Sequence, residues 1–503
     1  MIFQTVSGLF RAQVSARPER VAIRADARAI TYRELGRRVA RLAAALAARG
    51  VQRGDRLAIL SENRIEYAEV ELAAARLGAI AACQNWRQAD PELEHCLRLV
   101  QPAVLFVSAR YAPTAERIAH GCPSTVCFGP EYEAMIDGTA PDVPPAGEAE
   151  DGLIILYTSG TTGLPKAAVI SHRAMIARAW THAVDRPTTE DDAFVAWTPM
   201  FHMGATDFTL GTLMRGGTVI VVDGFDAPAL ARLVATEQLG WLHVMPGTTE
   251  RLIDELRRSD VRPRGVRYCG VMPDLVPRKM IAELTRLLNA PYPSTFGSTE
   301  AGAMLSRSMI PIGEVPQRLS KRQSSFCEVR LVDDAGNAVE DAGTSGELEV
   351  RGPGLFSGYW NAGGPPLKDG WFATGDVFSR NADGSFEYVD RRTYLIKSGG
   401  ENIYPAEIER VLLAQSGVRE AVVVRRADPK WGEVPIAFVV AEEGRITAEQ
   451  LVEACRGSIA RYKTPREVRL VSHSELPRSV SGKVRRRELE ARLAEEAGVL
   501  RGT

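Results

Sequence analysis

Residues 153–166 read LIILYTSGTTGLPK, an apolar run that changes abruptly into glycines, hydroxyl side chains and a lysine. The first five residues predict a buried strand, and seven of the nine residues 158–166 are Gly, Ser, Thr or Lys. Glycines let backbone N–H groups turn toward an anion, while hydroxyls and an ammonium add donors and positive charge. The stretch therefore predicts a phosphate-binding loop after a strand, formed by Thr158, Ser159, Gly160, Thr161, Thr162, Gly163 and Lys166.

This loop differs from the phosphate loop of GTPases. That loop requires G-x-x-x-x-G-K-[ST] at the start of a helix, whereas here Pro165 precedes Lys166 and residues 167–170 continue as an apolar strand. A flexible Ser/Thr/Gly hairpin is the alternative for this segment taken alone. Other motifs in the chain must decide between the two.

Strands and helices alternate on both sides of the loop. Residues 31–50 combine a capping box with apolar side chains at helical spacing, and residues 56–60 form a short apolar strand. The same alternation returns over residues 217–245, which favours parallel sheets covered by helices. From about residue 326, β-branched runs separated by glycine turns predict a β-rich subdomain.

The last part of the chain predicts a separate small unit. After residue 392 the pattern indicates helices at 405–414 and 448–456 and strands at 421–424 and 436–440. We therefore predict an α/β fold with two domains. Residues 1–392 form a large N-terminal domain of helix-covered sheets plus the β-rich subdomain, and residues 393–503 form a small, mobile α+β lid.

Composition narrows the classes of function. The 503 residues are 45% hydrophobic and 25% charged, unlike a disordered or fibrous chain. A net charge of −1 gives no attraction to nucleic acid, and no apolar stretch approaches the roughly 20 residues of a membrane span. The start lacks a secretory signal, and the seven scattered cysteines have no C-x-x-C pair or zinc-like spacing. We expect a cytoplasmic protein with reduced thiols.

Six motifs occur in an order that is typical of one family. They are 158–166 (TSGTTGLPK), 201–204 (FHMG), 296–300 (FGSTE), 374–376 (TGD), Asp390-Arg391 leading to 397–405 (KSGGENIYP), and 477–483 (PRSVSGK). In these motifs nearly the whole chain resembles the adenylate-forming superfamily, which includes acyl-CoA synthetases, firefly-luciferase-like enzymes and peptide-synthetase adenylation domains. The resemblance favours the acyl-CoA synthetase and aryl-CoA ligase branch.

The resemblance implies ATP and Mg²⁺ as ligands of the large domain. Glu300 would hold Mg²⁺, with Thr299 beside it as a phosphate donor, and Phe296 would stack on adenine where the family usually has tyrosine. Asp376, which can accept from both ribose hydroxyls, and Arg391 would bind the ribose. From the residues alone, the alternatives are a solvated loop glutamate, a turn aspartate and a surface arginine.

Two more glycines and a lysine complete the implied nucleotide site. They are Gly270, Gly297 and Lys483. Composition around Lys483 favours an exposed turn lysine, but in relatives this lysine enters the site for adenylation and leaves when the small domain rotates. The resemblance implies that Lys483, Thr299, Glu300 and His202 form the catalytic set. The family's hinge usually holds Asp or Lys where this chain has Thr393.

The rotation would also build a site for coenzyme A. In the family it brings the strand at Gly399 and Gly400 to the active site as part of a pantetheine channel, and glycines allow that close backbone approach. Trp431, Tyr462 and Arg466 fall where some CoA-forming relatives contact CoA. Ordinary surface residues are the alternative for these three.

His202 bears on the choice of acid. It stands where amino-acid-activating relatives place an aspartate for the α-ammonium, so amino acid substrates are disfavoured. The resemblance implies that His202 borders the carboxylate, and a packed core histidine is the alternative. The implied pocket walls are small and apolar, without a Lys or Arg for a second carboxylate: Met203, Gly204, Ala205, Gly247, Thr248, Gly270, Val271, Met272, Gly297, Ala301 and Gly302. Gly247 and the run 269–273 depart from the family's usual residues.

We therefore expect an ATP-dependent acid–CoA ligase. A hydrophobic carboxylic acid, whether fatty, alicyclic or aromatic, would be adenylated to acyl-AMP with release of pyrophosphate and then transferred to the CoA thiol. The alternatives are a ligase that loads the phosphopantetheine of a carrier protein and a non-catalytic nucleotide-binding regulator. The expected partners are the acid, ATP and CoA, without nucleic acid or a membrane span, and the oligomeric state is left open.

Overall fold

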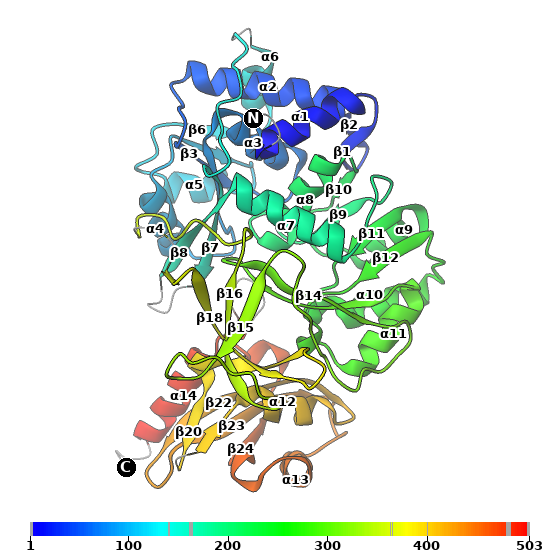
Figure 1. The fold of residues 1–503 in the computed structure, drawn as a ribbon, viewed down its shortest axis with the longest axis vertical. Coiled ribbons are helices and arrows are strands. Elements are labelled where there is room, and N and C mark those ends of the chain that lie inside the picture. The colour runs from blue at the N-terminus through cyan, green and yellow to red at the C-terminus, as the bar shows by residue number, and fades with distance from the viewer. Residues whose placement is uncertain are drawn as a thin grey trace.

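The computed structural model describes residues 4–138, 141–159, 164–362, 364, 366–399, 401–478 and 484–499. Figure 1 shows helix-covered sheets near the N-terminus, a sheet-rich middle and a small unit of strands and helices at the C-terminal end. This mixed architecture confirms the predicted α/β class. The domain boundary at residues 392/393 stays a prediction.

A six-stranded sheet carries the strand that leads into the predicted phosphate loop. Its order is β6-β5-β3-β4-β7-β8, and neighbours are parallel except for the antiparallel pair β7 and β8. Residues 153–156 are fully or nearly fully buried, as expected for a strand covered on both faces. The strands are β3 (Arg56–Leu60), β4 (Ile80–Cys83), β5 (Val104–Val107), β6 (Thr125–Cys127), β7 (Gly152–Ser159) and β8 (Pro165–Ser171).

Helices of the N-terminal part surround this sheet. The Thr31 hydroxyl accepts from the Glu34 N–H at 3.2 Å and starts α2, as the sequence predicted. Every residue of α3 is buried, so this helix lies between layers. The helices are α1 (Val6–Ala16), α2 (Tyr32–Ala48), α3 (Ile65–Leu77), α4 (Asp90–Val100), α5 (Ala112–Ile118) and α6 (Pro130–Asp137).

Two further sheets lie next to each other, since β11 contacts β9. One has the order β2-β1-β10-β9, and the other pairs β11 with β12 in parallel. Their strands are β1 (Val21–Ala25), β2 (Arg28–Thr31), β9 (Phe194–Ala196), β10 (Val219–Val221), β11 (Gln238–Leu242) and β12 (Gly265–Cys269). The helices are α7 (His172–Asp185), α8 (Met203–Arg215), α9 (Ala227–Thr236), α10 (Thr249–Arg258) and α11 (Arg278–Leu288). α7 and α8 pack against each other in the middle of the molecule (Figure 1).

The middle of the chain is built from antiparallel strands. β13 (Tyr292–Ser298) and β14 (Gly302–Ile310) form a hairpin. A five-stranded sheet follows, with β15 (Glu328–Val332), β16 (Ser345–Arg351), β17 (Leu367–Lys368), β18 (Trp371–Arg380) and β19 (Phe386–Arg391). The sequence pattern missed β18. Because Asp376 lies on this strand and is only 2% exposed, the turn-aspartate alternative is wrong.

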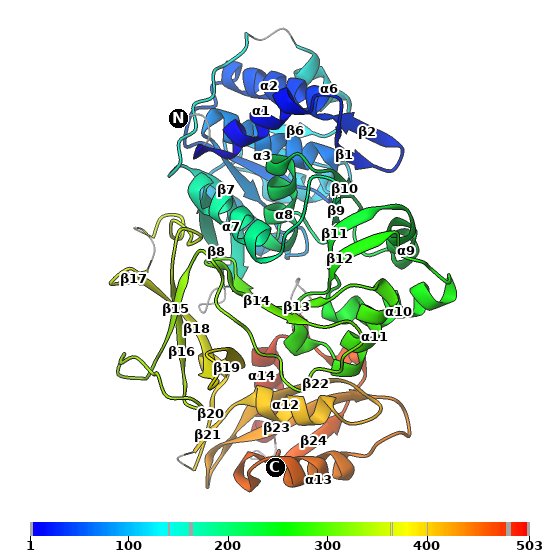
Figure 2. The ribbon, with the colours of Figure 1, turned by 45° about the vertical axis from the view of Figure 1, so that its right-hand side comes forward.

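The C-terminal part has its own sheet and hydrophobic clusters, and it lies below the other sheets in Figure 2. The sheet order is β21-β20-β23-β22, with β24 parallel to β23. Its elements are β20 (Ile396–Ser398), β21 (Glu401–Ile403), α12 (Pro405–Leu413), β22 (Val418–Asp428), β23 (Gly432–Ala441), α13 (Ala448–Ser458), β24 (Glu467–Leu470) and α14 (Arg486–Val499). The Asp390 carboxylate ties β19 to α12 by accepting from the Ala406 N–H at 2.8 Å.

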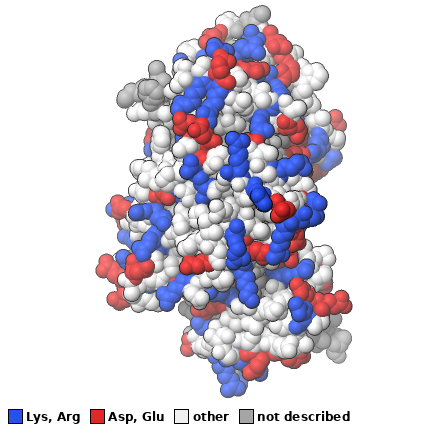
Figure 3. Space-filling model, turned by 90° about the vertical axis from the view of Figure 1, so that its right-hand side faces the viewer, with Lys and Arg blue, Asp and Glu red and all other residues white. Residues whose placement is uncertain are grey.

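Charges of both signs are interspersed over the face shown in Figure 3, in keeping with the net charge of −1. Within the described ranges, no helix has both the length and the apolar character that a bilayer crossing requires.

Candidate active site

The turn between β13 and β14 presents the carboxylate of Glu300. The Tyr359 hydroxyl donates to Glu300 Oε1 at 3.0 Å, and the Phe356 N–H donates to the Glu300 carbonyl at 2.8 Å. Burial, followed by the charge of Glu300, raises the pKa of the Tyr359 phenol, so this hydroxyl stays protonated and donates. The carboxylate is therefore oriented by a side chain from a distant loop.

Lys166 reaches the same tyrosine from β8. Its ammonium nitrogen lies 5.1 Å from the centroid of the Tyr359 ring, which is a cation–π distance. Thr158 of β7 pairs with Lys166 across the antiparallel ladder. The structure thus brings Thr158, Lys166 and Glu300 together. The Glu300 carboxylate fits Mg²⁺, which proteins usually hold through one or two carboxylates and the substrate's phosphates. The Lys166 ammonium suits the phosphates themselves.

Several predicted residues lie outside the described residues. They are Gly160, Thr161, Thr162, Gly163, Gly400 and Lys483, together with the side chain of Ser159. Their roles stay predictions from the sequence and from the resemblance.

The two predicted ribose ligands face each other on neighbouring strands. Asp376 of β18 and Arg391 of β19 are partners in the antiparallel register, and Arg391 Nε donates to Asp376 Oδ1 at 3.0 Å. Phe296 lies beside them, because its ring stacks on Tyr388 at 5.5 Å and meets the edge of Phe378 at 4.8 Å. The structure therefore gathers Phe296, Asp376 and Arg391 around one aromatic cluster.

Two predicted site glycines lie where a side chain would not fit. A Cβ on Gly270, whose φ is +79°, would lie 2.0 Å from the Tyr292 ring. A Cβ on Gly297 would lie 2.4 Å from the Gly302 carbonyl oxygen. Both backbones approach their neighbours too closely for any other residue without a rearrangement.

His202 caps α8 from an exposed position. Its Nδ1 accepts from the Gly204 N–H at 3.2 Å, and its side chain faces solvent. The alternative of a packed core histidine is therefore wrong for His202. His243 of this region is buried and His182 is partly buried, and the sequence analysis did not single out either.

Three rings lie next to the predicted acid walls, and we call Phe208, Trp241 and His243 the aromatic layer. Their centroids are 4.5–5.2 Å apart with nearly perpendicular planes. Burial, with smaller contributions from neighbouring charges, lowers the pKa of the His243 imidazole to about 3, so this ring is neutral. The layer adjoins the predicted walls, since Phe208 follows Gly204 by about one turn of α8 and Trp241 Nε1 donates to the Gly270 carbonyl at 2.8 Å.

The other wall residues lie on three segments near this layer. Gly247 and Thr248 belong to a short 3₁₀ turn, and Val271 and Met272 follow β12. Ala301 directly precedes β14, and Gly302 begins it. The Tyr292 hydroxyl donates to the Val271 carbonyl at 2.6 Å and fixes the second segment.

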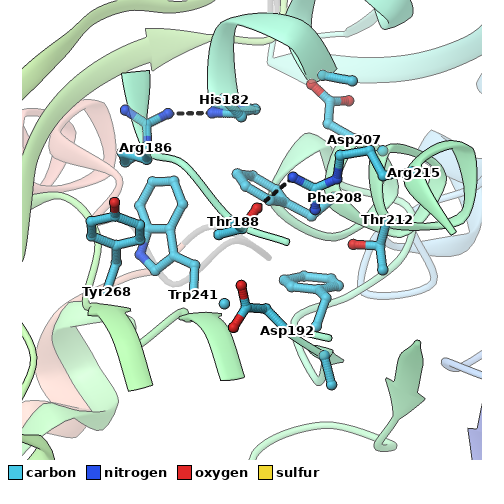
Figure 4. A pocket seen from close by; sticks show the side chains of 15 residues that line it. His182, Arg186, Thr188, Asp192, Asp207, Phe208, Thr212, Arg215, Trp241 and Tyr268 are labelled. Carbon is cyan, nitrogen blue, oxygen red and sulfur yellow. Dashed lines mark hydrogen bonds between the residues drawn. The ribbon is translucent and has the colours of Figure 1, made fainter. Parts of the chain in front are cut away.

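A small hollow beside the aromatic layer is lined by Phe208, Trp241 and several polar side chains, as Figure 4 shows. Its volume is about 30 Å³, enough for one or two water molecules. Arg186 and Arg215 line it, and the structure leaves the Nε atom of each without a hydrogen-bond partner. The predicted acid walls contain no arginine. The structure therefore adds Arg186 and Arg215 to the surroundings of the aromatic layer.

Two of the predicted CoA residues, Gly399 and Trp431, meet in the C-terminal part. Gly399 adopts φ +59° and packs its backbone on the Trp431 ring, and its N–H donates to the Trp431 carbonyl at 2.8 Å. Trp431 is 38% exposed, with the Lys430 ammonium 4.9 Å from its ring centroid. Among the described residues, the hydrogen bonds of Gly399 and Trp431 stay within this part, so the structure does not join them to Glu300.

This geometry can be compared with known proteins. The profile of the AMP-binding enzyme family matches residues 10–360, and that of the AMP-binding enzyme C-terminal domain matches residues 407–483. The chain belongs to the AMP-binding enzyme family. It is 36% identical to an indoleacetate–CoA ligase of Aromatoleum aromaticum, over 94% of this chain and 96% of that one. It is 35% identical to a feruloyl-CoA synthase of an Amycolatopsis species, over 96% and 97% of the two chains.

Solved structures agree with this assignment. The o-succinylbenzoate CoA synthetase of Bacillus subtilis, in complex with its acyl-adenylate intermediate, has a TM-score of 0.84 and 27% identity, over 96% of this chain and 97% of that chain. The family member described here is an AMP-forming acid–thiol ligase of the acyl- and aryl-CoA ligase group, a class that uses ATP, Mg²⁺ and CoA. Carrier-protein loading and a non-catalytic role are not favoured.

Proposed function

We propose that this ligase activates an apolar aromatic or arylalkyl carboxylic acid and transfers it to CoA. The observation that carries the proposal is the aromatic layer of Phe208, Trp241 and a neutral His243, which adjoins the predicted acid walls at Gly204 and Gly270. Aromatic rings favour such edge-to-face neighbours. A charged tail would instead lose its hydration against these rings.

The nucleotide side of the site suits the first half-reaction. Attack of a carboxylate on the α-phosphorus of ATP brings two anions together and expels pyrophosphate, so positioning and positive charge dominate catalysis. Lys166 and Glu300, linked through Tyr359, would hold the phosphates and Mg²⁺. Asp376 and Arg391 would hold the ribose, and Phe296 would pack against adenine.

The remaining roles come from the sequence. Lys483 would neutralise the reacting phosphate and carboxylate oxygens during adenylation, and Thr299 would donate to phosphate. His202, at the exposed start of α8, would border the carboxylate of the acid. After a rotation of residues 393–503, Gly399, Gly400 and Trp431 would guide the pantetheine thiol to the acyl carbon, where it displaces AMP.

The names of the relatives support an aromatic acid over a fatty one. Two are the ligases for indoleacetate and ferulate described above, and a third, a 2-succinylbenzoate–CoA ligase of Bacillus cereus, is 31% identical over 95% of this chain and 97% of that one.

A panel of acids tests the proposal. The purified enzyme is offered indole-3-acetate, phenylacetate, ferulate, octanoate, palmitate and phenylalanine with ATP, Mg²⁺ and CoA, and pyrophosphate release and acyl-CoA are measured. We expect the highest kcat/KM for an arylalkyl or aryl acid and none for phenylalanine. A preference for palmitate would overturn the aromatic assignment, and a preference for a holo-carrier protein over free CoA would overturn the acceptor.

A further inference from the structure

A buried arginine that the sequence analysis did not single out contacts the carboxylate turn. Arg178 lies on α7, and its side chain is 1% exposed. Its Nη2 donates to the Thr299 carbonyl at 2.8 Å, and its Nε donates to the Gly354 carbonyl at 3.0 Å. The Arg178 guanidinium thus joins the β13–β14 turn to residues 354–359, which we call the Tyr359 segment.

Those two segments also meet at Glu300 itself. The Phe356 N–H holds the Glu300 carbonyl, and the Tyr359 hydroxyl holds the Glu300 carboxylate. The carbonyls of two consecutive residues, Thr299 and Glu300, are therefore both fixed, and the carboxylate between the two segments has little freedom. If the Arg178 bonds were lost, the turn and the Tyr359 segment could shift relative to each other.

The space around the guanidinium is shaped for arginine. A Cβ on Gly302, whose φ is +67°, would lie 2.9 Å from Arg178 Cγ, so the arginine stem fills the space beside the start of β14. A planar guanidinium can donate in two fixed directions at once, whereas a lysine ammonium is a single point of charge. Lysine at this position would keep the charge but not both bonds.

The negative charge that pairs with Arg178 comes from Asp207 of α8, the helix that begins after His202. Asp207 of α8 lies 3.4 Å from Arg178 Nη1, and its side chain is 2% exposed. Burial raises the pKa of Asp207 and lowers that of Arg178, and the attraction between the two opposes both shifts. Through this pair, the helix that begins at His202 is connected to the turn that carries Glu300.

We propose that Arg178 is a positioning residue for the Mg²⁺ carboxylate: it fixes the Thr299–Glu300 turn against the Tyr359 segment and so sets the direction of Glu300. The inference rests on the proposed assignment of Glu300 to Mg²⁺. It goes beyond that assignment because it names the group through which α7 and α8 control the metal site.

The test is the Mg²⁺ dependence of adenylation in Arg178→Lys. Pyrophosphate release is titrated with Mg²⁺ at saturating ATP and acid, and transfer to CoA from supplied acyl-AMP is measured in parallel. We expect the Mg²⁺ midpoint, the Mg²⁺ concentration that gives half the maximal rate, to rise about tenfold or more. This size is typical for loss of a group that orients a metal ligand. Transfer from acyl-AMP should stay at the wild-type rate, whereas equal loss of both half-reactions would show a merely structural role and overturn the proposal.

Arg38→Lys is the matched control. Arg38 is also buried, at 7% exposure, and is ion-paired to Glu69 and Glu133 away from the site, so its replacement should leave the Mg²⁺ midpoint unchanged. Glu300→Gln separates the two proposals. An unchanged midpoint in that variant sinks the Glu300 assignment, whereas a shift there without one in Arg178→Lys sinks only the role of Arg178.

A second variant, Asp207→Asn, keeps the proposal testable if Arg178→Lys does not fold. If Arg178→Lys does not melt cooperatively, Asp207→Asn keeps the shape of the pair and removes its charge. We then expect a rise of about threefold in the Mg²⁺ midpoint, because a hydrogen bond to a charged group is weakened rather than deleted. An unchanged midpoint in a folded Asp207→Asn would overturn the proposal.

Discussion

The nucleotide side and the acid side of this site are built from different kinds of contact. On the nucleotide side, charged groups are held by polar partners, as in the Asp376–Arg391 pair and the Tyr359–Glu300 hydrogen bond. On the acid side, Phe208, Trp241 and a neutral His243 meet through their ring faces and edges. Phosphates and Mg²⁺ need oriented charge, whereas an apolar acid is favoured by leaving water for uncharged surroundings.

The difference also concerns precision. A hydrogen bond or ion pair depends on both distance and direction. Four of the nucleotide-side residues accordingly lie on strands in register: Thr158, Lys166, Asp376 and Arg391. Apolar contact is not directional, and the acid walls lie on a helix end, a 3₁₀ turn and a loop. We therefore expect changes on the nucleotide side to reduce rate strongly and changes on the acid side to redirect specificity.

The largest expected effect is on the nucleotide side, at Lys483. Lys483→Ala should lower acyl-AMP formation by about 10²–10³-fold, because a donor to developing negative charge is lost. Conversion of supplied acyl-AMP to acyl-CoA should be nearly unchanged, since no phosphate charge then develops. Lys279→Ala, at an exposed lysine, is the control. Equal loss in both half-reactions would contradict the assignment.

Asp376→Asn should act next most strongly. The buried carboxylate is replaced by an amide that keeps its shape but loses the charge paired with Arg391. We expect the KM for ATP to rise about 10- to 100-fold, in line with the strength of charge-assisted hydrogen bonds. Asp383→Asn alters a 58%-exposed aspartate in the turn before β19 and should leave the KM unchanged. A normal ATP KM in Asp376→Asn would remove this residue from the ribose site.

Phe208→Ala tests the acid side. Removal of the Phe208 ring should join the acid pocket to the small hollow shown in Figure 4. The kcat/KM for the preferred aryl acid should then fall about tenfold, while the kcat/KM for longer acids should rise. The KM for ATP should not change, and this contrast would sharpen the comparison between the two sides. Phe225→Ala, which removes a partly buried ring elsewhere, serves as control. A uniform loss for all acids would argue against a specificity role.

Trp431→Ala should have a smaller effect, confined to the thiol step. The Trp431 side chain is exposed, and a cation–π contact at such a site contributes only about 0.5–1 kcal/mol. We expect a two- to fivefold rise in the KM for CoA, since about 1.4 kcal/mol corresponds to tenfold. Pyrophosphate release in the absence of CoA should match the wild type. Leu470→Ala, at another exposed apolar residue of the C-terminal part, is the comparison variant.

Glu71→Gln should affect turnover least and act on stability. Glu71 on α3 is fully buried against Thr206 of α8, and burial raises its pKa from the ordinary 4.5 to about 8. The protonated carboxyl therefore contributes stability that is complete below pH 4.5 and is lost as the pH rises toward 8. Glutamine does not titrate, so the Tm of the variant relative to wild type should increase from pH 5 to pH 8. Parallel Tm curves would contradict the raised pKa.

Local sequence patterns predicted those helices and strands whose formation depends mainly on residues close together in the sequence. The strand at 153–157 and the helix after Thr31 follow from apolar periodicity and capping, and both are observed. Asp376 and Arg391 could be proposed together because each lies in a short motif to which the family resemblance assigns the ribose. The strand that carries Asp376 was missed, because its run of residues 371–380 includes Gly375 and Asp376, which indicate a turn when read locally.

The sequence by itself determined the α/β class and which residue types were available to bind phosphate, Mg²⁺ and ribose. These features depend on contiguous motifs and on the regular spacing of apolar residues, both of which are visible in the sequence. Only the tertiary structure decided which distant groups support them. Arg178 meets Thr299 across 121 positions, Tyr359 meets Glu300 across 59, and Phe208 meets Trp241 and His243 from a different element. Such partners depend on which helices and strands pack together, and that choice is made by burial of the whole core rather than by any local stretch of residues.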